Sequence, residues 1–262
     1  MREAIQAQLA DHPWAQQILY FDSIDSTNTY AKQLAVQGAA EGTVVIADHQ
    51  TGGRGRLGRS FASPAGMGIY LSVILRPDCR PDHLMHLTCA AGLAASDAVL
   101  QATGQAPGIK WTNDLILSRR KLGGILTELS VDPQSGKVAW AIIGIGINCC
   151  QQSTDFPPEI RDIAISLGLS PADRPRLAAS LIRALYEMQG KLQTKQAETI
   201  AAFQSRCVTI GQEVSVLRGD DVYHATATGI DRDGGLIVTL PDGSVRTVTS
   251  GEVSIRGMYG YV

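Results

Sequence analysis

The feature that most constrains this chain is residues 52–59, where four glycines and three arginines share eight positions and no acidic residue occurs. Glycine adopts backbone conformations that other residues avoid and lets the backbone approach a ligand closely. Strand-like runs flank the segment at residues 43–47 and 68–75. We therefore predict a loop held between two strands, which is where many ligand-binding residues lie.

The charge of this loop indicates what it binds. Arginine stays protonated, and its planar guanidinium donates paired hydrogen bonds to phosphate and carboxylate groups. Gly/Arg tracts also occur in disordered nucleic-acid-binding tails. Because this tract is short, internal and flanked by predicted strands, we favour a phosphate-handling loop.

Composition makes the basic loop a local feature on a nearly neutral protein. The 262 residues carry a formal net charge of −2 and are 44% hydrophobic, whereas a nucleic-acid-binding domain is usually strongly basic. No apolar run reaches the length needed to span a bilayer, and the first residues lack the apolar core of a signal peptide. We expect a cytoplasmic protein with neither DNA nor membrane as a partner.

The cysteines and histidines give no clear metal site. Five cysteines without a C-x-x-C pair are expected to be reduced and buried. His83, His86 and Cys89 stand three residues apart on a predicted helix, a spacing that could present three ligands. No fourth ligand accompanies them, so helix surface and core is the favoured interpretation.

Periodicity divides the chain into a larger α+β part and a small β part. A short helix is predicted at residues 3–17, a long one at 82–104, and two more at 175–193 and 195–207. From residue 212 onwards, five short alternating strands separated by Asp/Gly turns predict a small closed barrel. The predicted domains are 1–210 and 211–262.

Two lysines are candidates to assist the arginine loop, since the chain has neither a Walker loop nor a nucleophile elbow. Lys110 lies shortly before Asn113 and Asp114, and Lys121 lies just before a Gly-Gly pair. Asn113 and Asp114 could orient a lysine or approach Mg²⁺ carried by phosphates, or they could simply form a turn. Both interpretations remain open.

Five ordered motifs resemble those of biotin–protein ligases, and the resemblance spans essentially the whole chain. The motifs are residues 26–28, 50–59, 110–114, 120–128 and 144–148. Thr112 and Gly123 replace the family's usual proline and alanine, which are mild departures in backbone geometry. The resemblance implies a central mixed β-sheet flanked by helices, as in biotin/lipoate ligases and class II synthetases, followed by a C-terminal SH3-like barrel. Since no room precedes the first motif for a helix-turn-helix domain, we expect a monofunctional ligase.

The reaction that the resemblance implies is ATP-dependent biotinylation of a lysine on a biotin carboxyl carrier protein, an acetyl-CoA carboxylase subunit, through biotinyl-5'-AMP. Biotin and ATP are the implied substrates, with Mg²⁺, and the protein is expected to be a monomer or a homodimer. Two alternatives stay open: a lipoate-type acyl-adenylate ligase, and a non-catalytic biotin- or nucleotide-sensing module.

The resemblance also implies roles for individual residues. Lys121 and Arg56 are the expected catalytic residues, with Lys121 bridging the biotin carboxylate and the α-phosphate. Asp114 is the expected contact to Mg²⁺ through the phosphates. Biotin binding is expected at Ser26, Thr27, Asn28, Gln50, Arg54, Gly55, Arg56 and Lys121. Nucleotide binding is expected at Arg54, Arg56, Arg59, Phe61, Lys110, Asn113 and Asn148.

Overall fold

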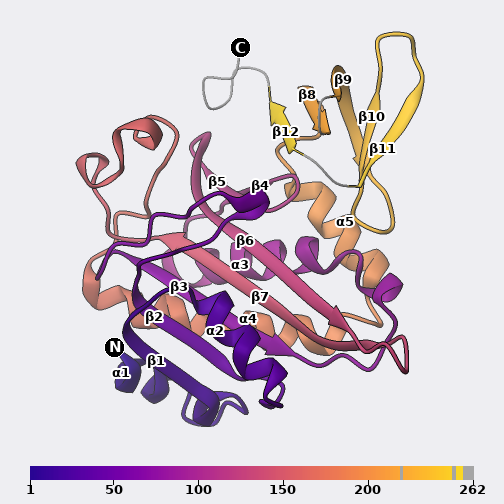
Figure 1. Ribbon diagram of the computed structural model, residues 1–262. Helices are drawn as coiled ribbons and strands as arrows, with labels where there is room; N and C mark the ends of the chain where they lie inside the picture. The colour runs from indigo at the N-terminus through magenta and orange to yellow at the C-terminus, as the bar shows by residue number, and fades with distance from the viewer. Residues whose placement is uncertain (219–220, 250–251, 256–262) are drawn as a thin grey trace.

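The computed structural model describes residues 1–218, 221–249 and 252–255 (Figure 1). Its larger part is a seven-stranded sheet in the order β1-β2-β3-β7-β6-β5-β4. The strands are β1 Ile18–Ile24, β2 Val44–Gln50, β3 Gly68–Leu75, β4 Gly108–Lys110, β5 Asp114–Leu117, β6 Arg120–Val131 and β7 Val138–Asn148. β1 and β2 run parallel and the other neighbours antiparallel, so the predicted mixed sheet is confirmed.

Helices cover both faces of this sheet (Figure 1). α2 (Thr27–Val36) packs on one face, over β2, β3 and β7. The opposite layer is built by α1 (Arg2–Gln8), α3 (Leu87–Thr103), α4 (Arg174–Lys191) and α5 (Gln196–Arg206). None of the helices in the described ranges is long and apolar enough to cross a bilayer.

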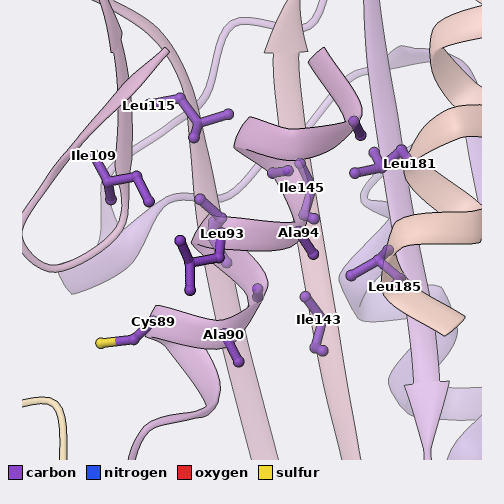
Figure 2. Packing of buried hydrophobic residues seen from close by; sticks show 14 of the residues in the cluster. Cys89, Ala90, Leu93, Ala94, Ile109, Leu115, Ile143, Ile145, Leu181 and Leu185 are labelled. Carbon is purple, nitrogen blue, oxygen red and sulfur yellow. The ribbon is translucent and has the colours of Figure 1, made fainter. Parts of the chain in front are cut away.

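Successive side chains of β7 contribute to the two hydrophobic clusters, one on each face of the sheet. Ile142 belongs to the cluster beneath α2, whereas Ile143 and Ile145 point to the other face, because successive strand side chains point to opposite sides. There they meet Ala90 and Ala94 of α3 and two leucines of α4 (Figure 2). Since alanine is small, α3 can lie close to the sheet.

Two predicted helices are longer than the observed ones. The helix predicted at 3–17 is wrong in its second half, because α1 ends at Gln8 and only a 3-10 turn follows at Ala15–Gln17. Pro13 has no amide hydrogen and disfavours helical geometry in the residue before it. The helix predicted from residue 82 starts later, since Pro81–Leu84 is a 3-10 turn and α3 begins at Leu87.

The C-terminal part is a five-stranded antiparallel sheet in the order β11-β10-β9-β8-β12. Its strands are β8 Glu213–Arg218, β9 Asp221–Ile230, β10 Leu236–Thr239, β11 Val245–Val248 and β12 Glu252–Ile255. The predicted small β domain is confirmed, but β11 and β12 do not pair in the described part of the chain, so the predicted closure of the barrel is not observed there. Residues 256–262 lie outside the described ranges, and the boundary at 210/211 stays a prediction.

Trp111 joins the two parts. Its indole Nε1 donates to the carbonyl of Gly234, in the turn between β9 and β10, at 2.8 Å. Its backbone N–H donates to Oγ1 of Thr209 at 2.9 Å. Because Trp111 lies between β4 and β5, the small sheet is attached directly to the segment that carries Asn113 and Asp114.

Candidate functional site

An open pocket lies where α2 begins beside the central sheet. It gathers the start of α2, the end of β2, the glycine–arginine loop and the middle of β6 and β7. The lining residues are Ser26, Thr27, Asn28, Gln50, Arg54, Gly55, Phe61, Gly124, Ile125, Leu126, Gly144, Ile145 and Gly146. Six of the eight predicted biotin-binding residues therefore lie around one hollow.

The first turn of α2 orients the polar wall of this pocket. Ser26 is the N-cap, and its Oγ accepts the N–H of Thr29 at 3.4 Å, as cap hydroxyls do. Thr27 donates to Oε1 of Gln50 from its backbone N–H at 2.8 Å and from its hydroxyl at 3.1 Å. The Gln50 Nε2 donates to Oγ of Ser63 at 2.9 Å. These bonds fix which end of the Gln50 amide donates and which accepts.

Asn28 forms the base of the pocket and is 4% exposed. Its Nδ2 donates to the carbonyl of Leu126 at 3.3 Å and to Oε2 of Glu128 at 3.0 Å. Its Oδ1 accepts from Oγ of Ser72 at 2.6 Å. Both amide hydrogens of Asn28 thus bond to β6. Asn28 therefore holds the start of α2 against β6 and so shapes the pocket.

Two glycines of β7 make room for the pocket walls. A Cβ on Gly144 would lie 1.9 Å from Oδ1 of Asn28, and one on Gly146 would lie 2.6 Å from the ring of Phe61. Phe61 lies over Gly146 and makes an edge contact with Tyr70, with ring centroids 6.4 Å apart. Although Phe61 is predicted to bind the nucleotide, it lines the same pocket as Ser26, and its nucleotide role stays a prediction.

Lys121 and Arg56, the two predicted catalytic residues, each have a protein partner. Lys121 Nζ lies 2.7 Å from Oδ1 of Asp114, and Arg56 donates to Oδ1 of Asn113 at 3.1 Å. A Cβ on Gly124, which lines the pocket, would lie 3.6 Å from the Asp114 carboxylate and 3.8 Å from Lys121 Nζ. Gly124 of the pocket wall therefore lies next to the Lys121–Asp114 pair, which is itself not among the lining residues.

The backbone of Lys121 is held on its outer side by the segment after β7. Its N–H donates to the carbonyl of Ile163 at 2.7 Å, and its carbonyl accepts from Ile165 at 2.9 Å. Asn148 Nδ2 donates to the carbonyl of Ile165 at 3.1 Å, and Asn148 Oδ1 accepts from Gln151 at 3.3 Å. Asn148, a predicted nucleotide contact, thus ties this segment to β7.

Five of the seven predicted nucleotide-binding residues are not among the residues that line this pocket: Arg56, Arg59, Lys110, Asn113 and Asn148. Arg59 is exposed, and its carbonyl accepts the N–H of Gly55 at 2.7 Å, which closes the base of the loop tip. Lys110 is 7% exposed and lies opposite Asp114 in the β4–β5 register. Their roles remain predictions.

Cysteine and histidine chemistry does not contribute to this site. Burial raises the pKa of Cys89 and that of Cys149 to about 12, so neither thiol is poised as a nucleophile. His86 is buried and bonds to the Leu192 carbonyl through Nε2 at 3.0 Å, whereas His83 is exposed. Among the described residues, no three His, Cys, Asp or Glu side chains form a metal-binding group.

Three residues of the pocket's hydrogen-bond network had no predicted role: Ser63, Ser72 and Glu128. Glu128 accepts from Asn28 and lies 3.5 Å from Nη1 of Arg54. Glu128 could have been found from the sequence, because it is a carboxylate near apolar residues within a predicted motif. Ser63 and Ser72 carry no such signal, because hydroxyls are common in loops and strands.

Comparisons with known proteins agree with this geometry. The sequence model of the Biotin/lipoate A/B protein ligase family matches residues 20–148, and that of the Biotin protein ligase C terminal domain matches residues 209–256. The bifunctional ligase/repressor BirA of Bacillus spizizenii is 34% identical over 244 residues, which cover 92% of this chain and 74% of that protein. The chain belongs to the biotin protein ligase family.

Other biotin protein ligases resemble the chain over most of their length. The biotin–[acetyl-CoA-carboxylase] ligase of Mycobacterium tuberculosis is 34% identical over 234 residues, which cover 87% of this chain and 85% of that protein. The biotin protein ligase from Aquifex aeolicus, solved in complex with biotin and ATP, superposes with a TM-score of 0.75 at 31% identity, over 91% of this chain and 98% of that one. The family and fold class predicted from sequence are confirmed.

Proposed function

We propose that this chain activates biotin with ATP and transfers it to a lysine of a biotin carboxyl carrier protein. Its family membership and its likeness to a biotin- and ATP-bound ligase support this function. The observation that carries it is the pocket beside α2, which offers both hydrogen-bond donors and acceptors next to a lysine amine.

The head of biotin is a ureido ring whose carbonyl requires donors and whose N–H groups require acceptors. In the described structure, the Ser26 hydroxyl hydrogen and the second Nε2 hydrogen of Gln50 have no acceptor. The Thr27 hydroxyl oxygen keeps a lone pair that can accept. We assign these three groups to the ureido ring and Phe61 to the apolar part of the ligand, because a buried polar head is bound only where its hydrogen bonds are replaced.

In the first step the biotin carboxylate attacks the α-phosphorus of ATP, and the bond to the β-phosphate oxygen breaks to release pyrophosphate. A carboxylate is ionised at neutral pH, so no general base is needed. Two anions must be brought together and the charge of the phosphoryl transition state stabilised. We assign this to Lys121, beside the pocket, and to Arg54 and Arg56 of the loop.

Mg²⁺ fits this site only as a companion of the nucleotide. The part of the chain that is described holds no all-protein cluster of metal ligands, and Mg²⁺ usually binds through one or two carboxylates plus substrate phosphates. Asp114, which already contacts Lys121, is the carboxylate in reach of the proposed phosphate position. We propose that Mg²⁺ enters with ATP and neutralises part of its phosphate charge.

In the second step the neutral amine of the acceptor lysine attacks the acyl carbon, AMP leaves, and the amine loses a proton. Because the acyl-adenylate reacts with water, it must be covered, and we propose that the loop at 52–59 closes over it. We further propose a cytoplasmic enzyme that is a monomer or a homodimer.

The reaction is tested by incubating the protein with a purified carrier domain, labelled biotin and MgATP. We expect label on the carrier and biotin-dependent pyrophosphate release. With lipoate in place of biotin, release should fall by about 10⁴-fold, because a dithiolane leaves the polar wall of the pocket without partners. Absence of labelling would argue for a sensing module, and equal rates with the two acids would argue for a lipoate-type ligase.

A further inference from the structure

We propose that Glu128 is a positioning residue that joins the base of the biotin pocket to the loop above it. The inference rests on the proposed function, in that the pocket is taken to bind biotin. Its basis is geometric: one carboxylate divides its two oxygens between a buried amide and a cation of the loop.

The two contacts of Glu128 have different characters. Oε2 accepts from Nδ2 of Asn28 at 3.0 Å, and Asn28 is 4% exposed and fixed by Ser72 and by the Leu126 carbonyl. Oε1 lies 3.5 Å from Nη1 of Arg54, whose side chain is 47% exposed against 21% for Glu128. Oε2 of Glu128 is therefore anchored to the buried Asn28, whereas Oε1 holds the long and half-exposed side chain of Arg54.

Arg54 stands within a loop that is costly to order. The loop contains four glycines, which have the largest backbone freedom to lose, and three arginines that repel one another. Backbone bonds at its base, such as Gly53 O with Phe61 N at 2.8 Å, hold the loop, and so does the hydrogen bond from Arg56 to Asn113. The Glu128 carboxylate adds a tie between Arg54 and the sheet. Glu128 thus helps to order the loop beside the pocket before a ligand arrives, which lowers the entropy cost of ordering the loop on binding.

A second consequence follows from charge. The ligand's own carboxylate and phosphates compete for Arg54, and Asn28 keeps Glu128 from following the arginine. Glu128 therefore stays at the pocket wall while Arg54 can turn to the anion. The residue acts through Asn28 and Arg54 rather than on the reacting atoms.

The first test uses the unliganded protein, because trypsin cuts after arginine and the loop offers three such sites. Glu128→Gln keeps an oxygen for Asn28 and removes the charge that holds Arg54. We expect about threefold faster cleavage within residues 54–59, in the range of a partly exposed ion pair, because cleavage follows the population of the open loop. Glu187→Gln, an exposed acid on α4, is the matched control and should cleave like the wild type.

The second test measures biotin binding by calorimetry and steady-state rates of pyrophosphate release. Glu128→Gln should raise the Kd and KM for biotin about threefold with kcat unchanged, since loop ordering affects ground and transition states alike. Glu128→Ala should raise them about tenfold, because an Asn28 hydrogen then loses its acceptor. In an Arg54→Ala background, Glu128→Gln should add no further loss.

Cleavage of Glu128→Gln at the rate of the Glu187→Gln control, or additive effects of Glu128→Gln and Arg54→Ala, overturns the proposal. A fall in kcat at constant KM overturns it as well, since that pattern reports a smaller folded fraction. If Glu128→Gln does not fold, Arg54→Met must by itself speed cleavage after Arg56 and Arg59. A wild type that releases no pyrophosphate contradicts the proposed function instead, and leaves the cleavage comparison valid.

Discussion

The ammonium of Lys121 lies 2.7 Å from the carboxylate of Asp114, next to Gly124 of the pocket that gathers six of the eight predicted biotin-binding residues. Asp114 opens β5 and Lys121 follows the hairpin into β6, where a bulge shifts the register. The lysine is therefore held in place before substrates arrive. Incoming carboxylate and phosphate groups supply further negative charge, so the amine can turn from Asp114 towards them.

Replacing this lysine should abolish most of the activation step. We expect Lys121→Ala to lower the rate of biotin-dependent pyrophosphate release by about 10²–10³-fold, the usual effect of losing one charge-stabilising group in a transition state. Lys121→Arg should retain a fraction, because the charge remains but the fork geometry differs. Lys137→Ala, which removes an exposed lysine paired with Asp78, should leave the rate unchanged. A Lys121→Ala rate within threefold of wild type would contradict the assignment.

Asn28→Asp tests the polarity of the pocket base with almost no change in shape. The new oxygen replaces the Nδ2 group that donates to Leu126 and Glu128, so two acceptors face it and a second carboxylate adjoins Glu128. We expect biotin affinity to fall at least about tenfold and the free energy of unfolding to drop by about 1–3 kcal/mol. Calorimetry and urea denaturation measure the two effects. Wild-type biotin affinity in this variant would show that the amide hydrogens of Asn28 do not matter.

Gly144→Ala should displace Asn28 and so deform the base of the pocket from the side of β7. The added Cβ would lie 1.9 Å from Oδ1 of Asn28, so the amide must move away from Ser72 and β6. We expect a loss of biotin binding together with about 1–3 kcal/mol of destabilisation, as for overpacked cores. Gly190→Ala is the matched control, since no atom lies within 4 Å of its Cβ in helix α4. That change should stabilise the protein by about 0.5–1 kcal/mol, and urea denaturation of both variants provides the comparison.

His86 should make the fold less stable in mild acid. Its Nε2 donates to the Leu192 carbonyl, and its buried Nδ1 has no partner in the described structure. Burial lowers the pKa of His86 below its usual 6.5, although the Leu192 bond and Asp233 oppose this. The folded state therefore binds fewer protons than the unfolded state, so stability is full above pH 6.5 and falls as the pH drops towards the folded pKa. Urea denaturation from pH 8 to 5 should show a shallower decline in His86→Gln, and parallel curves would contradict the prediction.

Features of the fold that depend on residues close in sequence could be predicted, whereas those that depend on residues far apart in sequence could not. The apolar runs at 43–47 and 68–75 and the turns after residue 212 predicted strands correctly, because neighbouring residues alone determine these patterns. The end of the first predicted helix and the start of the second were wrong near Pro13 and Pro81, because the local effect of these prolines was underweighted. Closure of the small barrel could not be read from alternation, since pairing of its edge strands is a long-range contact.

For the site, sequence by itself determined that a flexible cationic loop lies between two strands and that a lysine precedes a glycine pair, and the ordered motifs indicated the family. Only the tertiary structure decided which of these residues share a pocket. Asn28 bonds to Glu128 across 100 positions, and Phe61 lies over Gly146. Such pairs form when the sheet brings distant strands together, and no local propensity encodes the register that selects them.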